Sequence, residues 1–432
     1  MENLDNYYGR IFTNAQLPDQ ITNFANQIQS MQEVGNHLIC NRCGNEVSKE
    51  NKLPRGNYYC RECIVFGRNI NESHLYYFPQ KKFPKIDSLH WAGQLTAFQS
   101  EVSRGLLKGI EQKENLLVHA VTGAGKTEMI YQSVASVLDK GGCVCLASPR
   151  IDVCLELHKR LKRDFRCPIT LLHGNSDSYK RAPLIICTTH QLLKFHHAFD
   201  LLIIDEVDAF PFVDNSMLYH AVDNSIAKDG IKIFLTATST DELDRKVKKR
   251  EITKLHLARR FHAKPLVIPK MVWISSVLSK MKKQRLPNKL LGLIKKQRET
   301  GFPLLLFFPN IEQGKHLACI LKDSFPSETI DFVSSKTENR LEIVENFRKK
   351  EVTVLVSTTI LERGVTFPCV DVFVILANHR LYTKSALIQI SGRVGRSADR
   401  PTGELLFLHD GKTKAMSKAI REITEMNRRG GF

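Results

Sequence analysis

The chain has 432 residues, 42% of them hydrophobic, and 63 lysines and arginines against 45 aspartates and glutamates give it a net charge of +18. This length suits two to four domains, and the positive balance favours polyanionic partners such as nucleic acid. No apolar segment approaches the ~20 residues that cross a bilayer, since the longest candidate, Pro303 to Pro309, is short and ends in proline, so a membrane-spanning protein is excluded.

Residues 1–36 are polar and rich in glutamine and asparagine, which predicts a loosely ordered N-terminal arm. They show neither a positively charged leading region nor a long apolar stretch, so we expect no signal peptide and a compartment in which cysteines stay reduced. Seven of the eleven cysteines are then expected to be buried small hydrophobic residues: Cys143, Cys145, Cys154, Cys167, Cys187, Cys319 and Cys369.

The other four cysteines form two closely spaced pairs within residues 37–70, namely Cys40, Cys43, Cys60 and Cys63. Two residues separate the members of each pair, which is typical of a tetrahedral four-cysteine zinc site. Gly44 lets the backbone turn so that its N–H groups point at sulfur. A disulfide pair and an iron–sulfur cluster are the alternatives. We predict a Zn2+ module here, which either contacts DNA through its basic and aromatic side chains or only docks on its neighbour.

A glycine-rich segment, Gly123-Ala124-Gly125-Lys126-Thr127, follows the apolar run from Leu116 to Val121. Glycines allow a loop to approach a triphosphate closely before it opens into a helix N-terminus with partial positive charge. Lys126 is then placed to reach the β- and γ-phosphates, and Thr127 to ligate Mg2+. The strict pattern has glycine at position 120, where this chain has alanine.

An acidic segment supports the same site. Asp205 and Glu206 follow the apolar run from Leu201 to Ile204, so both lie where a strand is expected to end. Asp205 is suited to hold Mg2+ through water, and Glu206 to activate the attacking water. The two motifs, in this order, predict binding and hydrolysis of ATP with Mg2+.

The second half of the chain adds two polar segments after strand-like runs. Thr236-Ala237-Thr238 follows Ile231 to Leu235, and two arginines, Arg393 and Arg396, lie far downstream. A guanidinium is a permanent, forked donor that stabilises charge on a γ-phosphoryl group. Alternating apolar and amphipathic stretches predict an α/β protein with two parallel-sheet lobes, over residues 88–255 and 262–432. Basic residues between 245 and 298, Arg260 among them, are expected to be largely exposed helix face, with direct contact to DNA as the alternative.

These ordered motifs, over roughly residues 95–410, resemble those of the DEAD-box-like superfamily 2 helicases and translocases. The resemblance implies two RecA-like lobes and assigns roles to matching positions. It assigns catalysis to Lys126, Asp205, Glu206, Gln389, Arg393 and Arg396. It assigns nucleotide binding to Gln99, Thr122, Gly123, Ala124, Gly125, Lys126 and Thr127. It assigns nucleic-acid contact to Pro149, Arg150, Thr188, Thr189, Asn310, Thr358 and Arg363. Two positions depart from the pattern, Ile390 in place of an arginine and Thr366 in place of an acid.

Within the superfamily, the segment from Thr358 to Pro368 is similar to the branch of the primosomal replication-restart helicase. A four-cysteine module ahead of a compact motor resembles the late-competence DNA-uptake ATPases of naturally transformable bacteria. That resemblance implies a cytoplasmic single-stranded DNA translocase, peripheral to the inner face of the cell membrane, that drives import of transforming DNA. It further implies a competence membrane channel and a phosphoribosyltransferase-like operon partner, and leaves oligomerisation open. A replication-restart or repair DNA helicase and a non-hydrolysing nucleic-acid adaptor are the alternatives.

Overall fold

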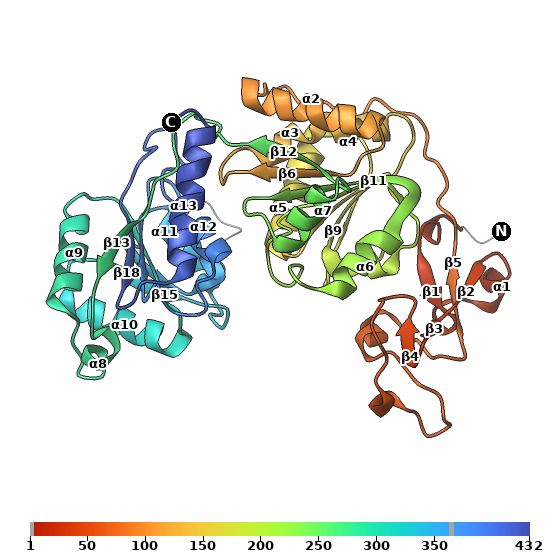
Figure 1. Ribbon diagram of the computed structural model, residues 1–432, viewed down its shortest axis with the longest axis horizontal. Helices are drawn as coiled ribbons and strands as arrows, with labels where there is room; N and C mark the ends of the chain where they lie inside the picture. Colours follow the sequence, from red (N-terminus) through yellow and green to blue (C-terminus); the bar gives the residue numbers. More distant parts are fainter. Residues whose placement is uncertain (1–3, 363–366) are drawn as a thin grey trace. The chain divides into compact units, whose positions relative to one another are not determined.

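The chain folds into two compact units, seen here in a computed structural model that describes residues 4–362 and 367–432. The first unit comprises Met1–His119 and Lys126–Leu257, and the second comprises Ala120–Gly125 and Ala258–Phe432. Each contains its own large sheet flanked by helices (Figure 1). None of the helices within the described ranges combines the length and the apolar character needed to cross a membrane.

The first unit is built on a seven-stranded sheet in the order β12-β6-β11-β10-β7-β9-β8. Every neighbouring pair from β6 to β8 is parallel. Its central strands are buried along their whole length, which explains why they are continuous apolar runs. The strands are β6 Leu116–Ala120, β7 Val144–Ser148, β8 Ile169–Leu172, β9 Leu184–Thr188, β10 Phe199–Ile204, β11 Ile226–Thr236 and β12 Thr253–Leu257.

Six helices accompany this sheet: α2 Ala97–Glu111, α3 Lys126–Met129, α4 Tyr131–Leu138, α5 Ile151–Asp164, α6 Ser216–Ser225 and α7 Asp241–Lys248. Helix α5 shows how the sequence sets their orientation, because Cys154, Leu157 and Leu161 recur at helical spacing and are its buried apolar residues. Since the carboxyl ends of parallel strands meet at one edge of a sheet, the loops after β6, β10, β7, β9 and β8 gather along that edge.

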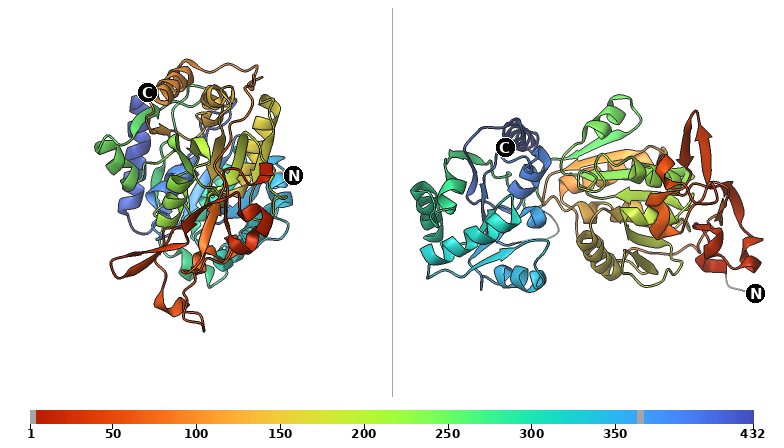
Figure 2. Two further views of the ribbon diagram at one scale, coloured as in Figure 1. Left: turned by 90° about the vertical axis from the view of Figure 1, so that its right-hand side faces the viewer. Right: turned by 90° about the horizontal axis from the view of Figure 1, so that it is seen from below.

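The N-terminal segment differs from the loosely ordered arm that its composition predicts. Its described part forms β1 (Ile11–Thr13), α1 (Asp19–Thr22), β2 (Asn26–Gln29) and β3 (Met31–Val34). Strands β1 and β2 pair antiparallel with the two sides of β5 (His74–Tyr77), and β3 pairs with β4 (His37–Cys40). Figures 1 and 2 show these strands beside the seven-stranded sheet. The few apolar residues of the segment are enough to form a small core, because they pack with residues distant in the chain around Phe12 and Phe78.

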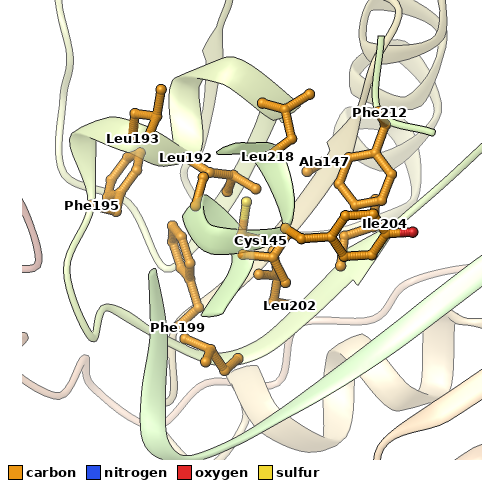
Figure 3. Packing of buried hydrophobic residues seen from close by; sticks show 14 of the residues in the cluster. Cys145, Ala147, Leu192, Leu193, Phe195, Phe199, Leu202, Ile204, Phe212 and Leu218 are labelled. Atoms are coloured by element: carbon orange, nitrogen blue, oxygen red, sulfur yellow. The ribbon is translucent and has the colours of Figure 1, made fainter. Parts of the chain in front are cut away.

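Apolar packing joins the four-cysteine segment to the first unit. Figure 3 shows Leu192, from the 3-10 helix η5 (Thr189–Lys194), close to Leu218 of α6. Phe195, just after η5, packs against Phe199 of β10 with ring centroids 4.9 Å apart. The same buried cluster continues to Met31, Val47 and all four paired cysteines. The module is therefore part of the core of the first unit, and a metal that orders it would also support this core.

The second unit contains a six-stranded, all-parallel sheet in the order β13-β18-β17-β14-β16-β15. Its strands are β13 Lys270–Trp273, β14 Leu304–Phe307, β15 Ile330–Val333, β16 Val354–Ser357, β17 Asp371–Ile375 and β18 Leu405–His409. Its helices are α8 Val277–Met281, α9 Asn288–Arg298, α10 Ile311–Ser324, α11 Arg340–Arg348, α12 Lys384–Ser391 and α13 Lys414–Arg429. Two parallel-sheet lobes with a four-cysteine module confirm the predicted fold class.

The seven cysteines outside the two closely spaced pairs are predicted to be buried, and the structure confirms this for only some of them. Cys143, Cys145, Cys154 and Cys187 are buried, as their positions in or beside β7, α5 and β9 require. Cys319 is exposed, and Cys167 and Cys369 are only partly covered. The prediction for Cys319 is wrong because this residue lies on the outer face of α10, opposite the apolar face that packs on the sheet.

Candidate nucleotide-binding and metal-binding sites

The glycine-rich loop has the backbone that its sequence requires. Gly123 and Gly125 have φ angles of 78° and 72°, in the left-handed region that glycine enters at little cost. The Ala124 N–H donates to the Val121 carbonyl at 3.2 Å, which closes the turn before α3 begins at Lys126. The loop thus connects the end of β6 to a helix N-terminus, the arrangement that binds phosphate groups.

The structure brings Lys126 and Asp205 together, although 79 positions separate them in the chain. The Lys126 ammonium nitrogen lies 3.4 Å from Oδ1 of Asp205, and both side chains are mostly covered. Lys126 follows β6 and Asp205 follows β10, with β11 between them in the sheet. The residue predicted to hold phosphate and the residue predicted to hold Mg2+ therefore lie at one point of the sheet edge.

Glu206 has a backbone conformation that non-glycine residues seldom adopt. Its φ is 55°, and its N–H donates to Oδ1 of Asp205 at 2.8 Å. A left-handed non-glycine residue costs on the order of 1 kcal/mol, and such residues concentrate at functional sites.

Asp208 and Thr238 form a connection that the sequence motifs alone do not reveal. The Thr238 hydroxyl donates to Oδ2 of Asp208 at 2.6 Å, and both side chains are buried. The Thr238 N–H donates to the Thr236 hydroxyl at 3.1 Å, which shapes the Thr-Ala-Thr turn after β11. The acidic segment and the Thr-Ala-Thr segment are thus joined by a charge-assisted hydrogen bond inside the protein.

His119 is a second residue that sequence reasoning missed. Its Nε2 lies 3.1 Å from the Ala237 carbonyl oxygen, so this nitrogen carries the proton and donates. Burial and the nearby Lys254 lower the pKa of His119 to about 3, so the ring is neutral. The signal available in the sequence was a single histidine inside the apolar run of β6, a position that a satisfied core histidine also occupies.

Gln99 takes part in capping α2. Its side-chain oxygen accepts from the Thr96 N–H at 2.9 Å, while its own N–H donates to the Thr96 hydroxyl at 3.3 Å. This reciprocal pair is a capping box, which a Thr-x-x-Gln pattern favours at any helix start. The predicted reading of adenine by Gln99 remains a prediction.

The strand-contact candidates of the first unit lie at the same edge as the phosphate motifs. Pro149 and Arg150 follow β7, and the Arg150 guanidinium lies 3.8 Å from Asp152. Thr188 ends β9 and keeps slight exposure, whereas Thr189 is completely buried. In this structure the Thr189 side chain therefore offers no surface to a strand.

Within the second unit, the predicted residues also follow strands or lie in α12. Asn310 caps α10 by accepting from the Gln313 N–H at 3.0 Å, and Thr358 follows β16. Gln389 and Arg393 are buried, and the Arg396 Nε donates to the Gly392 carbonyl at 2.9 Å. Two further positions singled out in the sequence, Arg363 and Thr366, lie outside the described residues, whereas Ile390 is completely buried in α12.

Arg260 is buried beside the arginine segment, in contrast to the exposed position predicted for it. Its guanidinium donates to the Val394 carbonyl at 2.9 Å and to the Gly395 carbonyl, while His262 lies 3.1 Å from the same Gly395 oxygen. Burial, with the Arg396 charge, lowers the pKa of Arg260 to about 9. The prediction was wrong because charge patterning could not show that a turn of the distant arginine segment needs a donor for its carbonyl oxygens.

The four paired cysteines converge on one small volume. Their sulfur atoms all lie within 4.8 Å of one another, with 3.7 Å between Cys40 and Cys63 and 3.5 Å between Cys43 and Cys60. A tetrahedral centre with Zn–S bonds of about 2.3 Å places sulfurs about 3.8 Å apart. The spacing fits one zinc ion, and it is too tight for a cluster of several irons, whose ligands lie on different metal atoms.

Surrounding groups stabilise the module and attach it to its neighbours. The Asn69 amide donates to the Cys40 sulfur at 3.1 Å, the kind of outer contact that orients a metal ligand. Arg42 is 1% exposed and donates to the Phe66 carbonyl at 2.6 Å and the Ile11 carbonyl at 3.2 Å. His220 of α6 lies 3.3 Å from the Asn41 carbonyl oxygen. The module is therefore docked on the first unit, and its buried guanidinium would offset part of the negative charge of four zinc-bound thiolates.

Comparison with known proteins identifies helicase domains in both halves. Residues 96–245 match the DEAD/DEAH box helicase family, and residues 282–398 match the helicase conserved C-terminal domain. The chain is therefore a superfamily 2 helicase and ATPase by family.

Two relatives are similar over most of their length. The chain is 59% identical to the competence protein ComFA of Streptococcus pneumoniae strain R6, over 100% of this chain and 99% of that protein. It is 38% identical to ComFA of Bacillus subtilis strain 168, over 90% and 85%. Among solved structures, the DEAD-box helicase Mss116 bound to single-stranded RNA and UDP-BeF has a TM-score of 0.55 at 20% identity, over 76% of this chain and 77% of that one, which shows a shared fold.

Proposed function

The chain belongs to the ComFA family of competence proteins, and on that premise we propose that it is a DNA-dependent ATPase that drives import of single-stranded transforming DNA during natural competence. The observation that carries the proposal is the Lys126–Asp205 pair, which unites a phosphate-binding loop with an acidic strand end. A competence-associated helicase or translocase follows from the family; hydrolysis by these residues and the import role are the proposed steps.

Each residue of the site has a chemical task. Backbone N–H groups of the 123–125 loop and the Lys126 ammonium would bind the β- and γ-phosphates, while Thr127 and Asp205 would hold Mg2+. Bound Mg2+ supplies positive charge that offsets the charge of the phosphates. Glu206 orients the attacking water and accepts its proton, a task that suits a carboxylate held by an unusual backbone.

We propose that the second unit contributes Gln389, Arg393 and Arg396 when ATP is bound, as the family resemblance implies. Arg393 and Arg396 would stabilise charge on the γ-phosphoryl group during its transfer to water. The buried Arg260 supports this by fixing the carbonyl oxygens of Val394 and Gly395 between the two arginines. Arg260 is thus a positioning residue.

Single-stranded DNA would contact both units, through Pro149, Arg150 and Thr188 in the first and through Asn310, Thr358 and Arg363 in the second. Hydrolysis can move a strand only if the ATP-bound and ATP-free states differ in their affinity for it. The Asp208–Thr238 hydrogen bond supports such coupling, because it joins the acidic segment to the Thr-Ala-Thr segment. By linkage, the strand must then affect ATP binding by the same factor.

The proposed setting is the inner face of the cell membrane, with a competence channel and a phosphoribosyltransferase-like protein as partners. Two relatives support the competence setting, since both are competence proteins: ComFA of Streptococcus pneumoniae and ComFA of Bacillus subtilis. The module of Cys40, Cys43, Cys60 and Cys63 would stabilise the first unit through its zinc ion.

Transformation of the organism that carries this gene tests the import role. Replacing the gene with a Lys126→Ala allele should lower transformation by orders of magnitude while growth and survival of DNA damage stay normal. Lys140→Ala, an exposed lysine two residues beyond α4, is the matched control and should transform normally. Normal transformation with Lys126→Ala, or sensitivity to damage in its place, would overturn the import role and favour a restart or repair helicase.

A further inference from the structure

A basic pocket lies at the β8 end of the sheet edge that carries the phosphate and strand motifs. Along that edge the carboxyl ends of β10, β7 and β9 carry, in order, Asp205, Arg150 and Thr188. Strand β8 follows β9 as the last strand of the sheet, and its loop begins at His173. A chain-like ligand that runs from the β7 loop past the β9 loop would meet the β8 loop next.

A cavity of about 400 Å3 lies at this loop. Its walls come from three separate segments of the first unit: the end of β8 with its loop, the end of η5, and Arg10 just before β1. The lining residues are Arg10, Leu172, His173, Gly174, Ser176, Asp177, Ser178, Tyr179 and Lys194. The open side of the loop is unobstructed, since a side chain built at Gly174 would meet no atom within 4 Å.

Arg10 is held in this cavity by the N-terminal segment that folds back onto the sheet. A bridge between Arg10 and Phe195 and a 3.0 Å hydrogen bond from the His196 N–H to the Gly9 carbonyl fix the segment beside η5. The guanidinium carbon lies 4.6 Å from the centre of the Phe12 ring and 4.7 Å from that of Tyr179. Stacking between two rings pre-orders the cation at little further entropic cost.

The polar atoms of the cavity suit an anion with several acceptor oxygens. Arg10 donates through Nη1 to the Asn6 carbonyl at 3.2 Å, whereas its buried Nε and the buried Tyr179 hydroxyl have no hydrogen-bond partner in the part of the chain that the structure describes. Lys194 adds a second cation, whose pKa is lowered by burial and by Arg10. Asp177 is the single carboxylate in the lining, and it is exposed. An anion between Arg10 and Lys194 would relieve their mutual repulsion and satisfy the buried donors.

We propose that this Arg10–Lys194 pocket binds a backbone phosphate of the single-stranded DNA, so that the N-terminal segment extends the strand path of the first unit. This inference rests on the proposed function, because it adds a contact to the same strand. The position of the pocket in the fold favours a phosphodiester of the strand over a free phosphate ion, because Lys194 ends η5, the helix that begins directly after Thr188. The short helix η5 therefore connects the pocket to Thr188, a residue predicted to contact the strand.

The test uses the full chain and a fluorescein-labelled oligothymidylate, with binding measured by anisotropy at several salt concentrations. Each phosphate contact removed lowers the slope of log K against log salt by about 0.7 for a single strand. Arg10→Gln and Lys194→Gln should each weaken binding about three- to ten-fold near 100 mM salt and lower this slope. Asp177→Asn should tighten binding about two-fold. Lys228→Gln, an exposed lysine near the start of β11, is the charge-matched control and should bind as the parent protein does.

The outcomes separate this inference from the proposed function. Parent-like affinity and slope in both Arg10→Gln and Lys194→Gln would overturn the pocket assignment while the proposed function stands. A parent protein that does not bind the oligonucleotide would overturn both. Tighter binding by Asp177→Asn supports the pocket and cannot result from misfolding. Inorganic phosphate, titrated at constant ionic strength, is the second arm. Binding of phosphate that Arg10→Gln abolishes, with an unchanged DNA slope, would assign the pocket to free phosphate and overturn the strand assignment.

Discussion

The hydrogen bond from Thr238 to Asp208 should be among the strongest single polar contacts of the first unit. It measures 2.6 Å, its acceptor is a carboxylate, and the two side chains are only 1% and 6% exposed. A hydrogen bond to a charged group contributes about 1.5–3 kcal/mol, and burial places this one near the upper end. Thr238→Val should therefore lower the free energy of unfolding by about 2–3 kcal/mol.

A matched pair elsewhere in the unit provides the control. The Thr253 hydroxyl donates to a Glu114 carboxylate oxygen at 2.8 Å, but both residues are exposed to solvent. Double-mutant cycles with Thr→Val and with Asp→Asn or Glu→Gln then compare the same chemistry in two environments. We expect a coupling energy of about 1–2 kcal/mol for the buried pair and below about 0.5 kcal/mol for the exposed pair.

Tryptophan fluorescence makes the first unit measurable by itself. The chain has two tryptophans, Trp91 in the first unit and Trp273 on β13 in the second. In a Trp273→Phe background, Trp91 emission during urea unfolding reports the first unit. Equal coupling energies in the two cycles would refute the view that Asp208 and Thr238 form a buried link, and with it the proposed route from the acidic segment to the Thr-Ala-Thr turn.

Three further predictions follow from the geometry. Cys40→Ser with Cys43→Ser should release one equivalent of zinc, measured by elemental analysis. The double variant should also lower the urea midpoint of unfolding reported by Trp91, because the module shares the core of the first unit. A parent protein without zinc would contradict this prediction. Lowering the pH from 7 to 5 should cost about 2 kcal/mol through His119, because its folded pKa of about 3 lies below the ordinary 6.5 and only the unfolded chain then takes up the proton. The slope of stability against pH should shrink in His119→Phe, and an unchanged slope would refute the assignment. Arg260→Gln should reduce strand-stimulated hydrolysis about ten-fold or more, because Arg260 positions Arg393 and Arg396. Strand binding should stay unchanged, since Arg260 is not among the predicted strand-contact residues. A parallel loss of hydrolysis and strand binding would indicate misfolding of the arginine segment.

Features set by short, local patterns could be predicted from the sequence. The strand ahead of Gly123, the strand ahead of Asp205 and the paired cysteines each need only a few neighbouring residues to specify them. Parallel strands buried on both faces are continuous apolar runs, so the two parallel-sheet lobes could also be predicted from the sequence. The family match then confirms the overall class.

Features that depend on distant partners could not be predicted. Strand β1 pairs with β5, more than sixty positions further along, and its three residues carry no pattern of their own. Arg42 and Arg260 are buried because carbonyl oxygens elsewhere in the fold need donors, whereas charge alone predicts exposure. Thr189 follows a strand as expected, but the packing of η5 turns its side chain inward.

We expect a strand and ATP to act on one site built around Lys126 and Asp205, and phosphate release with and without single-stranded DNA measures this. The parent protein should release phosphate from ATP several-fold faster, or more, when oligothymidylate is added. Lys126→Ala should show no such stimulation while keeping most of its affinity for the strand, and Lys140→Ala should match the parent. Equal turnover in the parent protein and Lys126→Ala, or a parent rate that the strand leaves unchanged, would show that Lys126 and Asp205 do not form a strand-stimulated ATPase site.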